Sequence, residues 1–198
     1  MYLWRKLSTE DQEALLAWRR QVSRPWHSPP HFAEGPGQFH LTAACYEHTD
    51  IVGANVGRMS SFCTELLRAL DSIVAVTHAW CVLPNHYHLL VDVLDLKQVT
   101  AALGRLHGRT SFLWNGEDEK RGRKVWCPPA DREIRGRSHY WATVNYIHNN
   151  PVKHGWAERW QDWPYSSAQD YLAAVGREEA LRLWRSYPLL DYGSGWDD

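Results

Sequence analysis

The stretch from Ile73 to Val93 holds two apolar runs that are separated only by Pro84 and Asn85. The first run, IVAVTHAWCVL, is rich in β-branched residues, and the second run, HYHLLVDV, begins directly after Asn85. Proline and asparagine favour turns, and β-branched residues favour strands. The stretch therefore predicts two antiparallel strands that pair as a hairpin.

The second of these strands carries two histidines, His86 and His88, one residue apart. Side chains alternate between the faces of a strand, so both histidines share one face and Tyr87 lies on the other. Two imidazoles at this spacing can share one divalent metal if a third ligand comes from another element. The alternative is a pair of structural histidines with partners in the core, and an H-x-H triplet alone does not separate the two hypotheses.

The rest of the chain alternates between helical and strand patterns. Four longer segments are expected to be helical, namely residues 8–24, 57–72, 95–114 and 138–150. A short helix follows the WPYSS sequence, with Ser166 or Ser167 as its cap. Further strands are predicted at residues 39–47 and, as short candidates, at 124–126 and 132–134. This order predicts an α+β fold in which an antiparallel sheet carries its helices on one face.

Length and composition fit one sizeable domain with short additions. The chain has 198 residues, 44% of them apolar, and a formal net charge of −1. We expect an N-terminal helix and Pro/Gly-rich linker at 1–36, the main domain at 37–173, and a C-terminal helix with an acidic tail at 174–198. No signal peptide and no apolar run of membrane-spanning length is evident, so a cytoplasmic location is expected. The cysteines form no C-x-x-C pair, which argues against a cysteine-based zinc site.

The helix predicted at residues 138–150 offers a candidate nucleophile. Ser138 can cap this helix, and Pro151 is expected to lie just past its end. Tyr146 and Asn150 are four residues apart and therefore share one helix face. A tyrosine can attack a phosphodiester when a metal polarises the phosphate. A packed aromatic residue on an amphipathic helix is the alternative explanation for Tyr146.

Two motifs resemble those of a known protein family. The sequence LPNHYHLLV resembles the HUH motif (histidine, hydrophobic residue, histidine) of single-tyrosine transposases. The sequences VNYIHNNPVKHGW and WPYSS resemble the catalytic-helix signature of the REP-associated tyrosine transposases. The resemblance covers roughly residues 37–172. Tyr87 stands where the family more often has an aliphatic residue, and the helix at 8–24 has no counterpart in the family pattern.

The resemblance implies a ferredoxin-like α+β domain that cuts single-stranded DNA next to a hairpin. Tyr146 would be the nucleophile, giving a 5′-phosphotyrosine link and a free 3′-OH, and strand transfer or religation would reverse the step. His86, His88 and Asn150 would hold a divalent metal, Mg or Mn. The implied partner is single-stranded or hairpin DNA, and a homodimer remains open.

Basic residues are concentrated just before the helix that carries Tyr146. Seven lysines and arginines lie between residues 120 and 137, against two acids. Such a segment predicts contacts to DNA phosphates, although a solvated loop explains the charge as well. The candidate DNA-binding residues are Arg121, Arg123, Lys124, Arg132, Arg135, Arg137 and Lys153, with Trp126 as a ring that stacks on an unpaired base.

Two other functions stay open at this point. A domesticated protein that still binds hairpin DNA, but no longer mobilises it, would need neither the tyrosine nor the histidines. A metal-dependent hydrolase unrelated to transposases would need more carboxylate or histidine ligands than the sequence near His86 and His88 offers. The retention of Tyr146 together with both histidines favours the DNA-cleaving enzyme.

Overall fold

The structure is a computed structural model that describes residues 8–11, 13, 14, 17, 35–190, 192 and 193. Within the predicted N-terminal helix, residues 9–11, 13, 14 and 17 are helical. The Ser8 hydroxyl accepts a hydrogen bond from the backbone N–H of Asp11 at 3.1 Å, as a helix cap does. The remainder of that helix, the linker up to residue 34 and most of the acidic tail lie outside the described residues.

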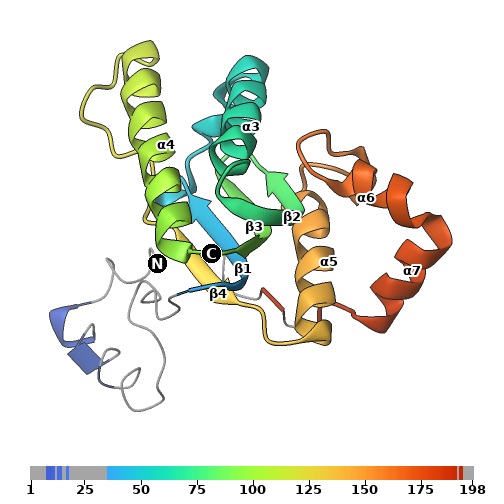
Figure 1. Cartoon of the computed structure of the whole chain (residues 1–198). Coiled ribbons are helices and arrows are strands. Elements are labelled where there is room, and N and C mark those ends of the chain that lie inside the picture. The colour runs from blue at the N-terminus through green and yellow to red at the C-terminus, as the bar shows by residue number, and fades with distance from the viewer. Residues whose placement is uncertain (1–7, 12, 15–16, 18–34, 191, 194–198) are drawn as a thin grey trace.

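Four strands form one antiparallel sheet (Figure 1). They are β1 (Gly37–Ala44), β2 (Val74–Val82), β3 (His86–Val93) and β4 (Ala130–Glu133). Their order across the sheet is β2-β3-β1-β4, and each neighbouring pair is antiparallel. Helix α3 (Val56–Leu70) connects β1 to β2, and α4 (Leu96–Glu117) connects β3 to β4. This βαββαβ order confirms the predicted ferredoxin-like α+β fold.

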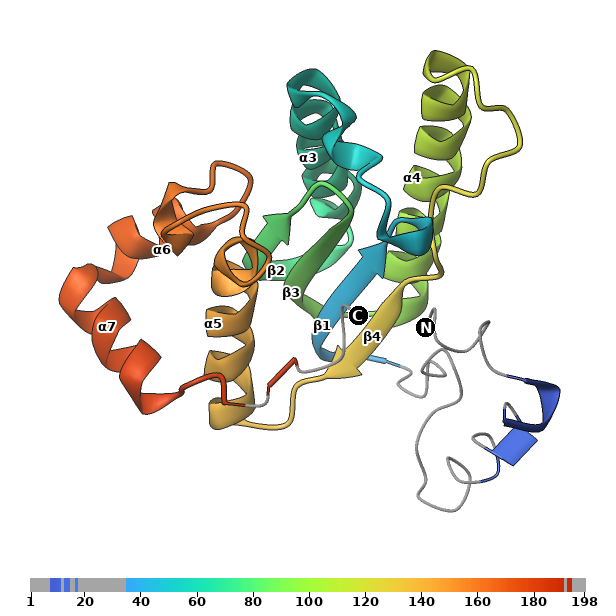
Figure 2. The same cartoon turned by 180° about the vertical axis from the view of Figure 1, so that it is seen from behind.

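Helices cover both faces of the sheet, and not one face as the sequence suggested (Figures 1 and 2). On the first face, Phe39 and Leu89 of the sheet pack with Phe62 of α3 and Leu103 of α4. On the second face, sheet residues pack with α5 (Arg137–Lys153), as the shared cluster of Leu90 and Ile147 shows. The periodicity of α5 did not reveal which face it covers, because helix spacing carries no information on the side of the sheet.

Helix α5 continues past the proline at which the sequence predicted its end. It runs through Pro151 to Lys153, so the predicted end at Asn150 is wrong. Proline removes one donor from the helix, but the carbonyl oxygens around it still find partners. Asn150 accepts from the N–H of His154 at 3.1 Å, and Pro151 accepts from the N–H of Trp156 at 2.8 Å.

Short elements complete the chain around this sandwich. They are the 3-10 turns η1 (Tyr46–His48), η2 (Val52–Ala54) and η3 (Trp160–Asp162), and the helices α6 (Ala168–Val175) and α7 (Arg177–Ser186). The strand expected at residues 124–126 is reduced to one bridge between Trp126 and Cys45. In the described part of the chain, no helix combines the length and apolar character that crossing a bilayer requires.

A buried arginine joins the start of α3 to the end of α4. Arg58 is 7% exposed and donates hydrogen bonds to the Asp118 carboxylate at 2.6 Å and to the Glu117 carboxylate at 2.8 Å. Arg123 donates to the same Asp118 carboxylate at 2.7 Å. Hydrogen bonds from Arg58, and then from Arg123, hold the pKa of Asp118 down at about 2. The ion pairs therefore fix the two helices that cover the first face.

We expect Arg58→Leu to lower the free energy of unfolding by about 3 kcal/mol, because it leaves a partly buried carboxylate with fewer partners. Urea unfolding at pH 7 measures the difference. Arg68→Leu, at an exposed position of the same helix, is the matched control and should stay within about 0.5 kcal/mol of wild type. Equal effects of the two substitutions would contradict a structural role for the Arg58 ion pairs.

Candidate active site

Three histidines gather on the sheet face that α5 covers. His86 and His88 project from β3, and His40 projects from the neighbouring strand β1. They are 2%, 0% and 3% exposed, respectively. The ring centroids of His86 and His88 lie 5.0 Å apart, and those of His40 and His88 lie 5.1 Å apart. Sequence reasoning missed His40, because a single histidine in a strand carries no spacing signal.

Each of the two β3 histidines has its Nδ1 atom held by another side chain. His86 Nδ1 lies 2.6 Å from Asn85 Oδ1, and Asn85 Nδ2 donates to the His48 carbonyl at 2.9 Å, which orients the amide. His88 Nδ1 lies 3.1 Å from His40 Nε2. Metal-binding histidines are held in this way by a partner on the second ring nitrogen. The arrangement therefore leaves Nε2 of His86 and Nε2 of His88 as the candidate ligand atoms.

Asn150 reaches His86 from α5. Its Oδ1 lies 2.8 Å from His86 Nε2, so the His86 ring meets an amide oxygen at each nitrogen. A neutral imidazole has one N–H and can donate to only one of these oxygens. Asn150 is fully buried, and its Nδ2 has no hydrogen-bond partner among the described atoms. A cation shared by Nε2 and Oδ1 would remove the conflict, since adjacent ligands of an octahedral divalent ion lie about 3 Å apart.

Tyr146 lies next to the histidines. Its ring centroid is 5.2 Å from that of His88 and 5.9 Å from that of His40, in both cases edge-on. Its hydroxyl oxygen Oη lies 3.4 Å from the Nζ atom of Lys153. Positions 146, 150 and 153 share one face of α5. The helix thus brings a phenol, an amide and an amine to the histidines of the sheet, and these include every residue predicted for the catalytic and metal sites.

The segment that follows α7 covers Tyr146, which is 1% exposed. The Tyr192 ring lies edge-on at 5.6 Å, and its hydroxyl hydrogen-bonds to Thr143. Gly193 has a φ of +80° and lies so close that a Cβ atom at this position would be 2.0 Å from Tyr146 Cε2. The Gly193 carbonyl accepts from Lys153 Nζ at 3.3 Å. Only glycine fits at position 193 in this conformation, because any side chain would collide with the phenol ring.

The WPYSS motif has a structural contact rather than a catalytic one. His148, two positions after Tyr146 on α5, points away from it, and its Nε2 lies 3.0 Å from the Ser167 hydroxyl. That hydroxyl also accepts from the backbone N–H of Trp80 at 2.9 Å, which joins α5 to β2. Burial lowers the pKa of His148 to about 3, so the ring is neutral.

Tyr87 occupies the opposite face of the sheet, as strand alternation predicted. Its hydroxyl lies 3.1 Å from His107 Nε2 of α4, and burial raises the pKa of Tyr87 well above the ordinary value. Burial also lowers the pKa of His107 to about 4. The second tyrosine is therefore separated from the candidate active site by the sheet itself.

The predicted DNA-binding arginines and lysine of residues 120–137 fall into two groups, and the first lies near the end of α4. Arg121 donates to the Phe112 carbonyl at 2.7 Å, and Arg123 is engaged by Asp118 as described above. Lys124 is exposed. These side chains surround the α4 end of the molecule and do not join the tyrosine site.

The second group lies where β4 leads into α5. Arg132 pairs opposite His40 across the sheet, and cross-strand partners share a face, so Arg132 lies on the side of the histidine cluster. Arg135 is exposed, with its Nε atom 3.4 Å from the Glu133 carboxylate, and Arg137 is the first residue of α5. Of this group, Arg132 is near enough to Tyr146 and Tyr192 to interact with them electrostatically.

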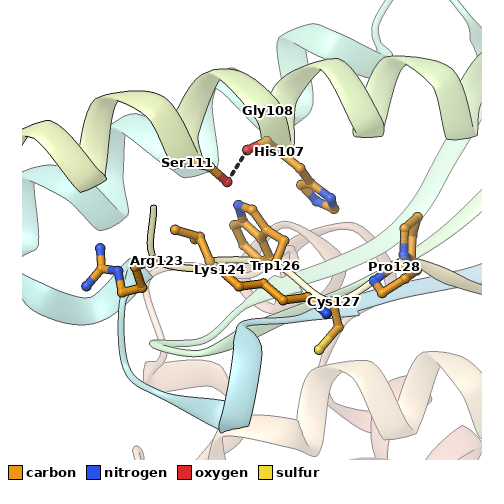
Figure 3. A pocket seen from close by; sticks show the side chains of 10 residues that line it. His107, Gly108, Ser111, Arg123, Lys124, Trp126, Cys127 and Pro128 are labelled. Atoms are coloured by element: carbon orange, nitrogen blue, oxygen red, sulfur yellow. Dashed lines mark hydrogen bonds between the residues drawn. The ribbon is translucent and has the colours of Figure 1, made fainter. Parts of the chain in front are cut away.

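Trp126 is buried, which corrects the prediction that its ring stacks on an unpaired base. It is 7% exposed, and its ring stacks on His107 at 4.4 Å and on Phe62 at 5.2 Å. Its Nε1 donates to the Thr110 hydroxyl at 3.0 Å. Figure 3 shows the indole beneath α4, at the edge of a shallow groove of about 360 Å³. A base could stack on this ring only if core contacts were broken.

Comparison with known proteins finds two relatives by sequence and a solved structure with a similar fold. No model of a known protein family matches the chain. The chain is 30% identical over 103 residues to the REP-associated tyrosine transposase of Escherichia coli (strain K12), a match to 46% of this chain and 52% of that protein. It is 33% identical over 112 residues to a Haemophilus influenzae protein named "Putative REP-associated tyrosine transposase", with 46% and 57% covered. The chain resembles the REP-associated tyrosine transposases.

The fold resembles that of a solved REP-associated tyrosine transposase as well. The structure of that protein bound to a REP hairpin matches with a TM-score of 0.53 at 20% identity, over 72% of this chain and 82% of the other. The sequence matches span about half the length of the curated REP-associated tyrosine transposases. The likeness therefore establishes the fold.

Proposed function

We propose that this chain is a metal-dependent endonuclease and strand transferase that acts on single-stranded DNA next to a hairpin. The observation that carries the proposal is the position of Tyr146, edge-on to His88 at 5.2 Å, on a helix whose Asn150 reaches His86 at 2.8 Å. A nucleophile and a set of candidate metal ligands thus meet at one place. A similar fold has been solved with a REP hairpin bound, which supports hairpin DNA as the substrate class.

Tyr146 supplies the nucleophile in this reaction. Its Oη attacks the phosphorus of a phosphodiester, and the bond from phosphorus to the 3′ oxygen breaks. The phenol proton passes to solvent, and the 3′ oxygen takes a proton to become a 3′-OH. The phosphate then links the 5′ end of the DNA to Tyr146. Attack by a 3′-OH on this link restores the phenol, so religation or transfer needs no ATP.

His86, His88 and Asn150 would hold Mg²⁺ or Mn²⁺, and Mn²⁺ suits imidazole ligands better. When bound, the ion would polarise a phosphate oxygen and reduce the charge that the nucleophile meets. His40 and Asn85 would orient the two imidazoles through their Nδ1 atoms. Arg132, on the same face of the sheet, supplies positive charge for the DNA backbone.

The test is a covalent adduct between protein and DNA. Incubation of the chain with a labelled hairpin-containing oligonucleotide and Mn²⁺ or Mg²⁺ should give an adduct that survives denaturing electrophoresis. We expect Tyr146→Phe to reduce its formation by more than about 10³-fold, because this variant lacks the attacking oxygen. Tyr140→Phe is the matched control, since Tyr140 lies on the same helix with its hydroxyl 3.3 Å from His78. Hairpin binding by wild type without any adduct would identify a domesticated binding protein instead.

A further inference from the structure

We propose that Lys153 is a catalytic residue of this chain, an inference that rests on the proposed function. Its ammonium group would stabilise the negative charge on Tyr146 Oη, both as this oxygen attacks phosphorus and as it leaves in the reverse step. Preorganised donors aimed at developing charge are among the largest contributions to catalysis. This role differs from a general contact to the DNA backbone, because the amine acts on the reacting atom.

The position of the amine on α5 is the first support. Lys153 Nζ lies 3.4 Å from Tyr146 Oη and 5.1 Å from the centroid of the phenol ring. The two residues are seven positions apart, which is two helical turns on one face. This register exists only because α5 continues through Pro151 as far as Lys153. If the helix ended at Asn150, its geometry would no longer place the amine beside the phenol.

Exposure gives the second support. Tyr146 is 1% exposed, whereas Lys153 is an exposed residue. An exposed residue thus places its amine 3.4 Å from the buried phenol oxygen. A phosphate that approached Oη from the side of Lys153 would meet the ammonium group as well, so one cation could contact the nucleophile and a phosphate oxygen together.

The contact with Gly193 gives the third support. The carbonyl oxygen of Gly193 accepts from Lys153 Nζ at 3.3 Å, next to the phenol oxygen at 3.4 Å. The amine thus already donates toward two oxygen atoms at once. A phosphate oxygen in place of the Gly193 carbonyl oxygen would accept from the same Lys153 Nζ. It would carry a negative charge, whereas the carbonyl is only a dipole.

The experiment compares Lys153→Met and Lys153→Arg with wild type in single-turnover adduct formation at saturating DNA, and in religation of the purified adduct by a 3′-OH strand. We expect Lys153→Met to slow both directions by about 10²-fold, because both pass through the same charged transition state. Lys153→Arg keeps the charge and should recover most of the rate. Lys97→Met is the matched control, because it removes an exposed lysine from α4 on the opposite face of the sheet.

The outcomes separate this inference from the proposed function. If wild type forms an adduct and Lys153→Met reacts as fast as Lys97→Met at saturating DNA, Lys153 is not catalytic. A weaker affinity for DNA with unchanged single-turnover rates would reduce Lys153 to a backbone contact. If wild type forms no adduct, the proposed function fails, and this inference fails with it. Thermal unfolding checks that each variant folds, as expected for a substitution at an exposed position.

Discussion

Replacement of His86 or His88 by alanine is expected to slow adduct formation by about 10³-fold. A metal that polarises a phosphoryl oxygen contributes several kcal/mol to the transition state, and about 4 kcal/mol corresponds to this factor. Each imidazole is one of the three proposed protein ligands, with Asn150 as the third, so its loss would leave the metal with two. Single-turnover adduct assays in Mn²⁺ and in Mg²⁺ measure the loss.

Three further variants serve as controls, and the expected effects on the rate of adduct formation are not the same for all three. His40→Ala and Asn85→Ala remove only the partners of the Nδ1 atoms, so we expect losses of about 10- to 100-fold. His78→Ala removes a partly exposed histidine that pairs with Asp92 at 2.9 Å and should leave the rate unchanged. Losses of similar size in all the variants would indicate a general effect on folding.

Binding of the metal can be measured without any reaction. A ligand that binds only the folded state raises its stability by an amount that grows with its concentration. Mn²⁺ should therefore raise the midpoint of thermal unfolding of wild type and of His78→Ala, but not that of His86→Ala. An equal shift in all three proteins would place the metal elsewhere and remove His86 from the ligand set.

The free energy of unfolding is expected to fall steeply as the pH drops from about 6.5 to 4. Burial lowers the pKa of His107 to about 4 and that of His148 to about 3. An unfolded histidine titrates near 6.5, so below this pH the unfolded state binds more protons than the folded state. Each histidine then contributes a loss of about 1.4 kcal/mol per pH unit. The contribution of these histidines to the free energy of unfolding is fully present above pH 6.5, where each ring is neutral in the folded and in the unfolded state.

Urea unfolding at pH 7, 6 and 5 measures this slope. His107→Gln and His148→Gln each remove one titrating ring, so each variant should show a slope smaller by about 1.4 kcal/mol per pH unit, whatever its stability at pH 7. Other histidines cancel in the comparison, because they are present in all three proteins. A wild-type slope that persists in both variants would show that these two rings do not titrate on unfolding.

The fold and the centre of the candidate site could be predicted from local patterns. The alternation of β3 fixes which residues share a face, and this alone places His86 and His88 together and Tyr87 opposite. The spacing of Tyr146 and Asn150 does the same on the helix. The prediction that the histidine face of β3 meets the tyrosine face of α5 came from the family resemblance. Local periodicity does not show which face of a strand contacts which face of a helix.

The features that sequence reasoning missed depend on contacts between distant segments. His40 joins the site only through the pairing of β1 with β3, and the core position of Trp126 depends on its stacking with His107. The basic residues between 120 and 137 form one cluster in the sequence. The chain turns between Lys124 and Arg132, so these residues lie in two separate regions of the surface. The helix continues past Pro151, and the carbonyls of Asn150 and Pro151 accept from the N–H groups of His154 and Trp156, which no rule based on proline alone anticipates.

If the chain acts as proposed, the close fit of Gly193 on the Tyr146 ring makes the chain compete with its own DNA substrate. Under the proposed function, DNA can reach the phenol only in molecules in which residues 192 and 193 have moved away. The apparent affinity for DNA is then lower than the intrinsic affinity by the fraction of molecules in that open state. The same few contacts that shield the nucleophile would therefore set how much DNA is needed before any strand is cut.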